Sequence, residues 1–112
     1  MNKYRNRKVL KDGAVFDSMK EYKRWCELKA LANAGKIRNL QRQVKFNLIP
    51  SQTLNGKVVE RPCTYVADFT YFEGASMVVE DVKGYRNGSA YALFVIKRKL
   101  MLMVHGIRIR EV

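Results

Sequence analysis

The stretch from residue 44 to residue 83 constrains the fold most, because strand-forming segments alternate there with turn-forming residues. The segments are rich in β-branched and aromatic residues, and the dipeptides between them favour tight turns. The predicted strands are Val44–Ile49, Val58–Phe72 and Ser76–Lys83, with turns at Pro50, Asn55-Gly56 and Glu73-Gly74 and an edge or a bulge at Pro62. Because the turn at Glu73-Gly74 is short, the last two strands should be neighbours in one sheet.

Helical patterns flank this β-region on both sides. Ser18-x-x-Glu21 fits a capping box, and Glu21, Trp25, Leu28 and Ala32 then follow one helical stripe as far as Gly35. The remaining predicted elements are a hairpin of Lys8–Leu10 and Ala14–Phe16, a loop over Gly84–Ser89, a helix over Tyr91–Val104 that ends near Gly106, and a strand over Ile107–Val112. The expected fold is a single α/β (α+β) domain over residues 1–112, with an N-terminal β-hairpin followed by α-β-β-β-α-β.

The net charge points to a polyanionic partner. Lys and Arg number 22 against 10 Asp and Glu, a formal charge of +12 on 112 residues. A nucleic acid would relieve the resulting self-repulsion, although ribosomal and membrane-surface proteins can be equally basic. No apolar run approaches the length of a membrane span, so we expect a cytoplasmic protein with no membrane partner. Cys26 and Cys63, with His105 as the only histidine, make a zinc site improbable.

Asp68 is out of place in its surroundings. It interrupts the apolar run from Tyr65 to Tyr71, where an unpaired buried carboxylate would cost several kcal/mol. The following strand carries Asp81 and Lys83, which share a face because side chains alternate along a strand, whereas Glu80 points the other way. Asp68 and Asp81 on neighbouring strands are therefore candidate ligands of Mg²⁺ or Mn²⁺, which prefer oxygen donors.

These residues carry a family resemblance. Ala67-Asp68-Phe69 followed by Glu80-Asp81-Val82-Lys83-Gly84 resembles the core motif of the PD-(D/E)XK nucleases, with Ala67 in place of the nominal proline. Glu21 on the preceding helix is similar to a metal-binding glutamate of many members. The likeness covers roughly residues 8 to 112 and is nearest to small phage and prophage proteins and, more loosely, to the phage junction-resolving endonuclease. It implies a restriction-endonuclease-like core.

The resemblance also implies a function. It implies Glu21, Asp68, Asp81 and the backbone carbonyl of Val82 as metal ligands, with Lys83 assisting the attacking water. The implied activity is endonucleolytic hydrolysis of branched or junction DNA in phage recombination or replication, by a homodimer in the host cytoplasm. The expected contacts to nucleic acid are the basic residues Lys8, Lys11, Arg86, Lys97 and Lys99, and Lys3 and Arg5 near the N-terminus are also candidates.

Simpler interpretations of the same residues stay open. Glu21 can serve only as the capping-box partner of Ser18, and Asp68 can form an ordinary ion pair with Lys83. Asp81 and Lys83 can lie on an exposed face of the sheet, and a bulge would exchange the roles of Glu80 and Asp81. Without such a bulge, Glu80 is expected to be solvated or to support the site from outside the ligand set. The alternative function is a basic nucleic-acid-binding protein without catalysis.

Overall fold

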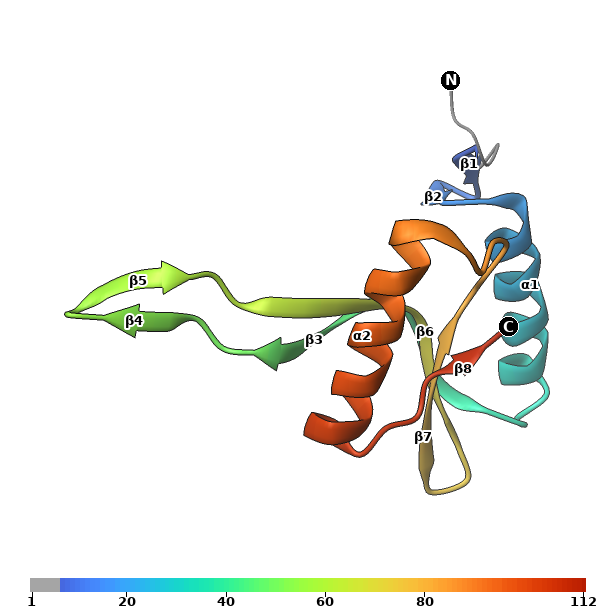
Figure 1. Cartoon of the computed structure of the whole chain (residues 1–112). Helices are drawn as coiled ribbons and strands as arrows, with labels where there is room; N and C mark the ends of the chain where they lie inside the picture. Colours follow the sequence, from blue (N-terminus) through green and yellow to red (C-terminus); the bar gives the residue numbers. More distant parts are fainter. Residues whose placement is uncertain (1–6) are drawn as a thin grey trace.

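A four-stranded sheet forms the centre of the computed structural model, which describes residues 7–112 (Figure 1). The strand order is β3-β6-β7-β8, in which the first two pairings are antiparallel and the last is parallel. The sheet strands are β3 (Arg38–Ile49), β6 (Cys63–Glu73), β7 (Ser76–Asp81) and β8 (Arg110–Glu111). The predicted hairpin at Glu73-Gly74 is confirmed, so β6 and β7 are neighbours in the sheet.

Two helices begin and end at the capping residues that the sequence offers. Helix α1 (Met19–Asn33) begins after Ser18, whose hydroxyl accepts the Glu21 N–H, and ends at Ala34 before Gly35. Helix α2 (Gly88–His105) begins after Asn87 and ends at Gly106, which has the left-handed conformation common at helix ends. In front of α1 lies the predicted hairpin, formed by β1 (Val9–Lys11) and β2 (Ala14–Phe16).

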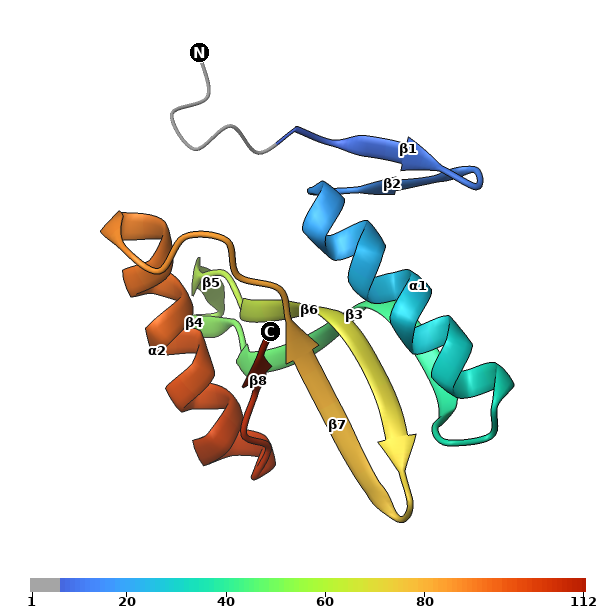
Figure 2. The ribbon, with the colours of Figure 1, turned by 90° about the vertical axis from the view of Figure 1, so that its right-hand side faces the viewer.

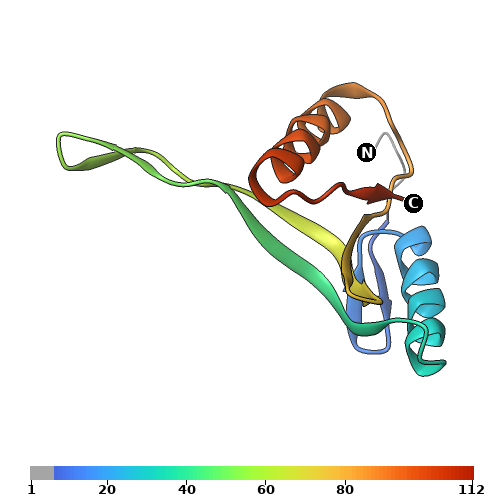
Figure 3. The same ribbon diagram turned by 90° about the horizontal axis from the view of Figure 1, so that it is seen from below.

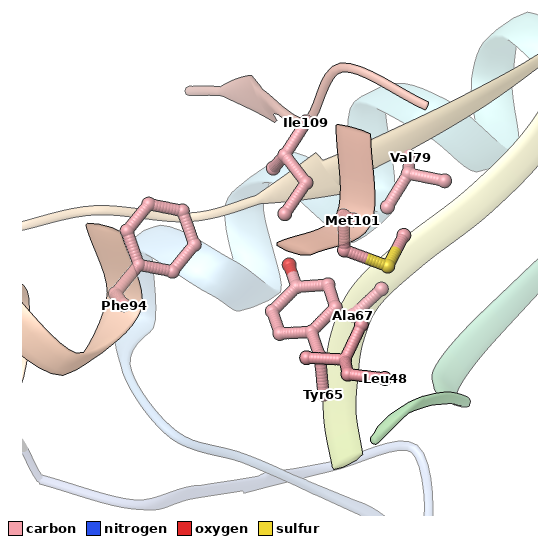
Figure 4. Close-up of a cluster of buried hydrophobic side chains, with 7 residues drawn as sticks. All are labelled: Leu48, Tyr65, Ala67, Val79, Phe94, Met101 and Ile109. Carbon is pink, nitrogen blue, oxygen red and sulfur yellow. The ribbon is translucent and has the colours of Figure 1, made fainter. Parts of the chain in front are cut away.

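The helices lie on opposite sides of the sheet (Figure 2). Val78 of β7 packs in a cluster with Leu28 of α1, whereas its neighbour Val79 packs in a second cluster with Phe94 and Met101 of α2. Adjacent residues of a strand point to opposite faces, so each face has its own small core. Figure 4 shows the α2 cluster.

Strand β6 turns about its axis in the middle of the sheet. Tyr65 and Ala67 belong to the α2 cluster, but Phe69 and Tyr71 belong to the α1 cluster. All four would share one face of a regular strand, so the change of face occurs around Asp68. On the partner strand β3, Gln43 lies between the residues paired with Ala67 and Phe69 and has a left-handed φ of 52°. The backbone distortion of β3 therefore lies opposite Asp68, the residue that the sequence singled out.

A two-stranded arm projects from the body of the molecule (Figures 1 and 3). It continues the β3–β6 ribbon and consists of β4 (Gln52–Leu54) and β5 (Lys57–Glu60), joined by the predicted Asn55-Gly56 turn. Both turn residues have positive φ, 51° and 76°, as this type of tight turn requires.

Several predicted boundaries were wrong. The predicted strand Val58–Phe72 is two strands, because its pairing is interrupted between Glu60 and Cys63, around Pro62. The strand predicted from Val44 begins at Arg38, the one predicted over Ser76–Lys83 ends at Asp81, and the last strand is limited to Arg110–Glu111. The loop predicted over Gly84–Ser89 is shorter, because α2 already begins at Gly88. The mixed α+β class and the order of the main elements agree with the prediction.

Along residues 7–112, neither helix combines the length and the apolar character that crossing a bilayer demands. Cys26 and Cys63 are free thiols; Cys26 is exposed and Cys63 is partly buried.

Candidate functional site

A polar cleft of about 550 Å³ opens beyond the end of β7, between the first turns of α1 and the first half of α2. Both helices begin on this side of the molecule (Figure 2). All four residues that the sequence predicted as catalytic line the cleft: Glu21, Asp68, Asp81 and Lys83. The β6–β7 hairpin supplies Asp68 and Asp81, and the packing of α1 on the sheet supplies Glu21.

Three carboxylates meet on the α1 side of the cleft. One ligand oxygen from each of Asp17, Glu21 and Asp68 lies within 4.8 Å of the other two. Asp17 is the residue just before the helix cap, and it was not among the predicted ligands. Asp81 is outside this group of three, although it lines the same cleft. The structure therefore brings together a set of carboxylates that overlaps with the predicted one but differs from it.

Glu21 is almost fully buried, with 2% of its surface exposed. Its Oε2 accepts the backbone N–H of Asp17 at 3.1 Å, and its Oε1 accepts a hydrogen bond from the Gln43 amide at 3.2 Å. Arg42 lies 3.7 Å from the same Oε1. The capping box is thus only half formed, because Glu21 turns toward Asp17 and the cleft instead of the Ser18 N–H. Burial raises the pKa of Glu21, although the hydrogen bonds and Arg42 oppose this.

The Asp68 carboxylate is held by a backbone N–H directly after the neighbouring strand β7. Its Oδ2 accepts the Val82 N–H at 2.7 Å, and its Oδ1 lies 3.5 Å from the Gln43 amide nitrogen. Burial, and next the charge of Asp81, raise the pKa of Asp68 to about 7. The alternative of an ordinary ion pair between Asp68 and Lys83 is not realised, since Lys83 pairs with Asp81.

Asp81 has two partners of its own. Its Oδ2 lies 2.5 Å from Lys83 Nζ, and its Oδ1 accepts a hydrogen bond from the Tyr65 hydroxyl at 3.0 Å. The shared face of Asp81 and Lys83 agrees with the predicted alternation. The Lys83 ammonium also lies 3.6 Å from the centre of the Phe94 ring, and Lys20 donates to the Lys83 backbone carbonyl. Lys83 is therefore fixed from both helices.

The donor set fits a hard divalent cation. The cluster offers oxygen atoms only, and it places three carboxylates within 4.8 Å of one another, where their charges repel. Arg42 and Lys8 each approach one member, Glu21 and Asp17 respectively, but the pKa of Asp68 stays raised. A cation held by Asp17, Glu21 and Asp68 would relieve this repulsion.

Glu80 is not solvated, so the first of its two predicted environments was wrong; it lies outside the cleft and the carboxylate cluster, as the second predicted. Its side chain is completely buried on the α1 face, where Arg24 donates two hydrogen bonds, at 2.8 and 2.6 Å, to its two oxygens. The Tyr71 hydroxyl donates a third at 2.5 Å. No bulge exchanges Glu80 with Asp81, since Glu80 is paired regularly with Phe69.

The basic residues predicted to contact nucleic acid are dispersed. Lys97 lines the cleft, whereas Lys11 and Lys99 are exposed on β1 and α2. Lys8 forms an exposed ion pair with Asp17, and Arg86 reaches Glu111, which also binds Arg98 and Tyr91. Lys3 and Arg5 lie outside the described residues. The cleft adds Lys20, which was not predicted because nothing in its local pattern distinguishes it from a solvated helix lysine.

Comparison with known proteins gives a family but no activity. Residues 1–108 match the model of a family described as a protein of unknown function (DUF1064). The chain belongs to this family. Neither the curated proteins nor the solved structures gave a match to the chain. For this DUF1064 member, the geometry of the cleft is therefore the basis for a functional argument.

Proposed function

We propose that this DUF1064 protein is a Mg²⁺- or Mn²⁺-dependent DNA endonuclease of the PD-(D/E)XK type. The observation that supports the proposal is the meeting of Glu21, Asp68, Asp81 and Lys83 in one cleft from three separate elements. Carboxylates that can hold a divalent cation, together with a lysine amine in the same cleft, fit metal-dependent phosphodiester hydrolysis. The net charge of +12 supports a nucleic acid as the substrate.

The residues of the cleft divide the work. Asp17, Glu21 and Asp68 would hold the cation, with the Val82 carbonyl as a further candidate from the family resemblance. A bound Mg²⁺ or Mn²⁺ supplies Lewis acidity that polarises the scissile phosphate and stabilises the leaving oxygen. Lys83 orients the attacking water or neutralises charge on the phosphate, and Asp81 with Phe94 keeps its amine in place.

Two versions of the metal site are open, and they differ in whether Asp81 is a ligand. The sequence motif makes Asp81 a ligand, whereas the geometry makes Asp17 the third member of the carboxylate cluster. Calorimetric titration with Mn²⁺ of Asp17→Asn and Asp81→Asn would distinguish them. We expect the Asp17 variant to lose most of its affinity for Mn²⁺. A loss of Mn²⁺ affinity in the Asp81 variant alone would instead support the ligand set of the sequence motif.

Branched or junction DNA in phage recombination or replication is the substrate that we propose, with a homodimer presenting two clefts to two strands. Origin in a phage or prophage, and action in the cytoplasm of the bacterial host, belong to the same proposal. These points rest on the family resemblance.

The deciding experiment is a cleavage assay on supercoiled plasmid and on a four-way junction, with Mg²⁺ or Mn²⁺. We expect Lys83→Met to lower the rate by about 100-fold, as for loss of a group that assists proton transfer. The matched control is Lys36→Met, an exposed lysine outside the cleft, which should retain full activity. Binding of DNA without cutting by the wild-type protein would reject the enzyme and favour the non-catalytic binder.

A further inference from the structure

The arm formed by β4 and β5 is the largest feature that the proposed active site does not use. Every residue from 50 to 62 is exposed, and the arm forms a two-stranded sheet of its own. Isolated two-stranded hairpins are at best marginally stable in water. The arm also leaves Leu54 66%, Val58 62% and Val59 50% exposed, which is unfavourable unless these side chains meet a partner.

The surface of the arm is continuous with the cleft. Thr64 and Val66 of β6 line the cleft, and their cross-strand partners on β3 are Asn47 and Lys45. Paired residues lie on the same face of a ribbon, so this face leads from the cleft toward the arm. A molecule bound in the cleft would therefore meet the base of the arm next.

The charge of the ribbon identifies the kind of partner. Residues 38–62, which form β3 and the arm, contain five basic residues and one acidic residue, Glu60. Lys57 and Arg61 are exposed on the arm itself. The ribbon therefore carries a net charge of +4, which attracts a nucleic acid and repels the same ribbon of a second copy.

We propose that the β4–β5 arm binds duplex DNA by lying in its major groove, about one helical turn from the strand held in the cleft. This inference rests on the proposed function, because it takes DNA as the substrate. A two-stranded ribbon fits the major groove of B-form DNA, which is about 12 Å wide. The eleven residue steps from Gln43, in the cleft, to Leu54, near the tip, span roughly 36 Å at the rise of a β-strand. One turn of B-form DNA is about 34 Å long.

The contacts would divide into two kinds. Lys57 and Arg61, which lie in β5 and directly after it, bind phosphates along one side of the groove, which makes this part of the binding dependent on salt. Leu54 and Val59 cover base edges and sugar, where their exposed apolar surface is removed from water, whereas Val58 points to the opposite face of the ribbon. The A-form duplex of RNA has a deep and narrow major groove that does not admit a ribbon, so the arm discriminates against double-stranded RNA.

The test measures binding of the full chain to duplexes of 12 and 26 base pairs in EDTA, which prevents cleavage. In an arm-shortened variant, an Asn-Gly turn joins Ile49 directly to Cys63, which are partners in the sheet. We expect its affinity for the 26-base-pair DNA to fall about tenfold, and its affinity for the 12-base-pair DNA to change less than about twofold. The same protein should bind double-stranded RNA as the wild type does.

A second variant keeps the arm and removes its charges. Lys57→Ala with Arg61→Ala should lower the slope of log affinity against log salt by about 1.8, or about 0.9 for each phosphate that the arm no longer neutralises. The matched control removes the same charge from α1 and the turn after it, with Lys23→Ala and Lys36→Ala, and should leave the slope unchanged. Figure 1 shows α1 at the end of the molecule away from the arm.

Three results would overturn the inference. The first is equal affinity of the wild-type and arm-shortened proteins for the 26-base-pair DNA. The second is a loss of affinity for double-stranded RNA, on shortening the arm, as large as the loss for DNA. The third is a wild-type dimer that becomes a monomer when the arm is shortened, which would make a second copy the occupant. If the wild-type protein cuts DNA and the arm has no effect, only this inference fails. If the wild-type protein neither binds nor cuts DNA, the proposed function fails with it.

Discussion

Asp68 lies where a negative charge is unfavourable. Its carboxylate is mostly buried, close to the charges of Asp81 and Glu21, and the hydrogen bond from the Val82 N–H only partly compensates for this. Its pKa is raised to about 7, and the pKa of Glu21 is raised mainly by burial. In the metal-free protein, ionisation of these side chains therefore lowers the free energy of unfolding.

Replacing Asp68 by Asn should change how stability depends on pH. The pKa of Asp68 is higher in the folded chain than its ordinary value of 3.8, so its contribution to the free energy of unfolding is intact below about pH 4. This contribution decreases as the pH rises from about 4 to about 7. Above pH 7 the free energy of unfolding no longer changes through Asp68. We expect Asp68→Asn to be more stable than the wild type at pH 8 by about 2 kcal/mol, after allowance for water in the cleft.

Urea denaturation in EDTA at pH 5 and pH 8 measures this difference, with Glu60→Gln as the control for loss of an exposed carboxylate. Addition of Mn²⁺ should reverse the order, because the wild-type site gains the cation and the variant does not. A wild-type protein that is equally stable at both pH values would contradict the expected burial of charge.

Single residues were predictable where they violated a local rule. Asp68 interrupts an apolar strand and Asp81 shares a face with Lys83, and both facts can be read from the sequence. Asp17 was missed because a carboxylate beside a helix start has an ordinary explanation in capping. Its approach to Asp68 depends on how α1 packs against the sheet, which no local pattern specifies. Gln43 and Tyr65 were missed for the same reason, since each reaches its carboxylate across strands.

Helix α1 is positioned on the sheet by a buried ion pair. Arg24 of α1 binds Glu80 of β7 through two hydrogen bonds, and Tyr71 of β6 completes the set. The bonds to Glu80 raise the pKa of Arg24, which stays protonated. This pair sets the position of the helix three residues after Glu21, so it also determines where Glu21 lies relative to Asp68. The element that carries a candidate ligand thus depends on a contact outside the cleft.

Removal of only one partner of this buried ion pair should strongly destabilise the protein. Arg24→Met leaves the completely buried Glu80 carboxylate without its counterion, and we expect a loss of about 3 kcal/mol in the free energy of unfolding. The double variant Arg24→Met with Glu80→Gln should recover part of this loss, because the unpaired charge is gone. Chemical denaturation of the single and double variants measures both effects.

Glu27 offers the control within the same network. It also contacts Arg24, at 3.0 Å, but its side chain is 64% exposed. Glu27→Gln should therefore change stability by less than about 0.5 kcal/mol. A Glu27 variant as unstable as Arg24→Met would mean that the helix surface, and not the buried pair, holds α1 in place.

Element boundaries were less predictable than the order of the elements. Pro62 indicated an edge or a bulge within one strand over residues 58–72, but the sequence did not show that pairing stops there and divides the strand in two. The start of β3 at Arg38 was hidden because Arg38–Gln43 is polar and is stabilised by pairing with the distant β6. Pairing between distant strands depends on tertiary contacts, and local composition does not record it.

The molecule as a whole has an uneven distribution of packing. Two small cores lie on opposite faces of the sheet, one under each helix, whereas the described residues of the arm have no buried side chains. The existence of the Asn55-Gly56 hairpin was predictable from its turn. That the hairpin projects from the body was not predictable. The projection depends on how far β3 and β6 continue as a pair beyond the rest of the sheet.

This uneven packing predicts a gradient of hydrogen exchange in the free protein. Amides of β4 and β5 should exchange through local opening, because no apolar core holds the arm together. Amides of Phe69–Tyr71 and Val78–Glu80 should exchange only through opening of most of the molecule, since both cores contact these segments. Mass spectrometry would measure exchange in peptides from the arm, where we expect it to be fast, and from the β6–β7 hairpin, where we expect it to be slow. When DNA is added, Ca²⁺ or EDTA is present to prevent its cleavage.

Added 26-base-pair DNA should slow exchange in the arm and leave the β6–β7 hairpin nearly unchanged, because only the arm gains a partner for its exposed surface. Dilution of the free protein supplies the control. If arm amides are already protected without DNA and lose that protection on dilution, the arm packs against a second copy. Protection that is independent of both DNA and dilution would mean that the hairpin is stable by itself, and its exposed Leu54, Val58 and Val59 would then need no partner.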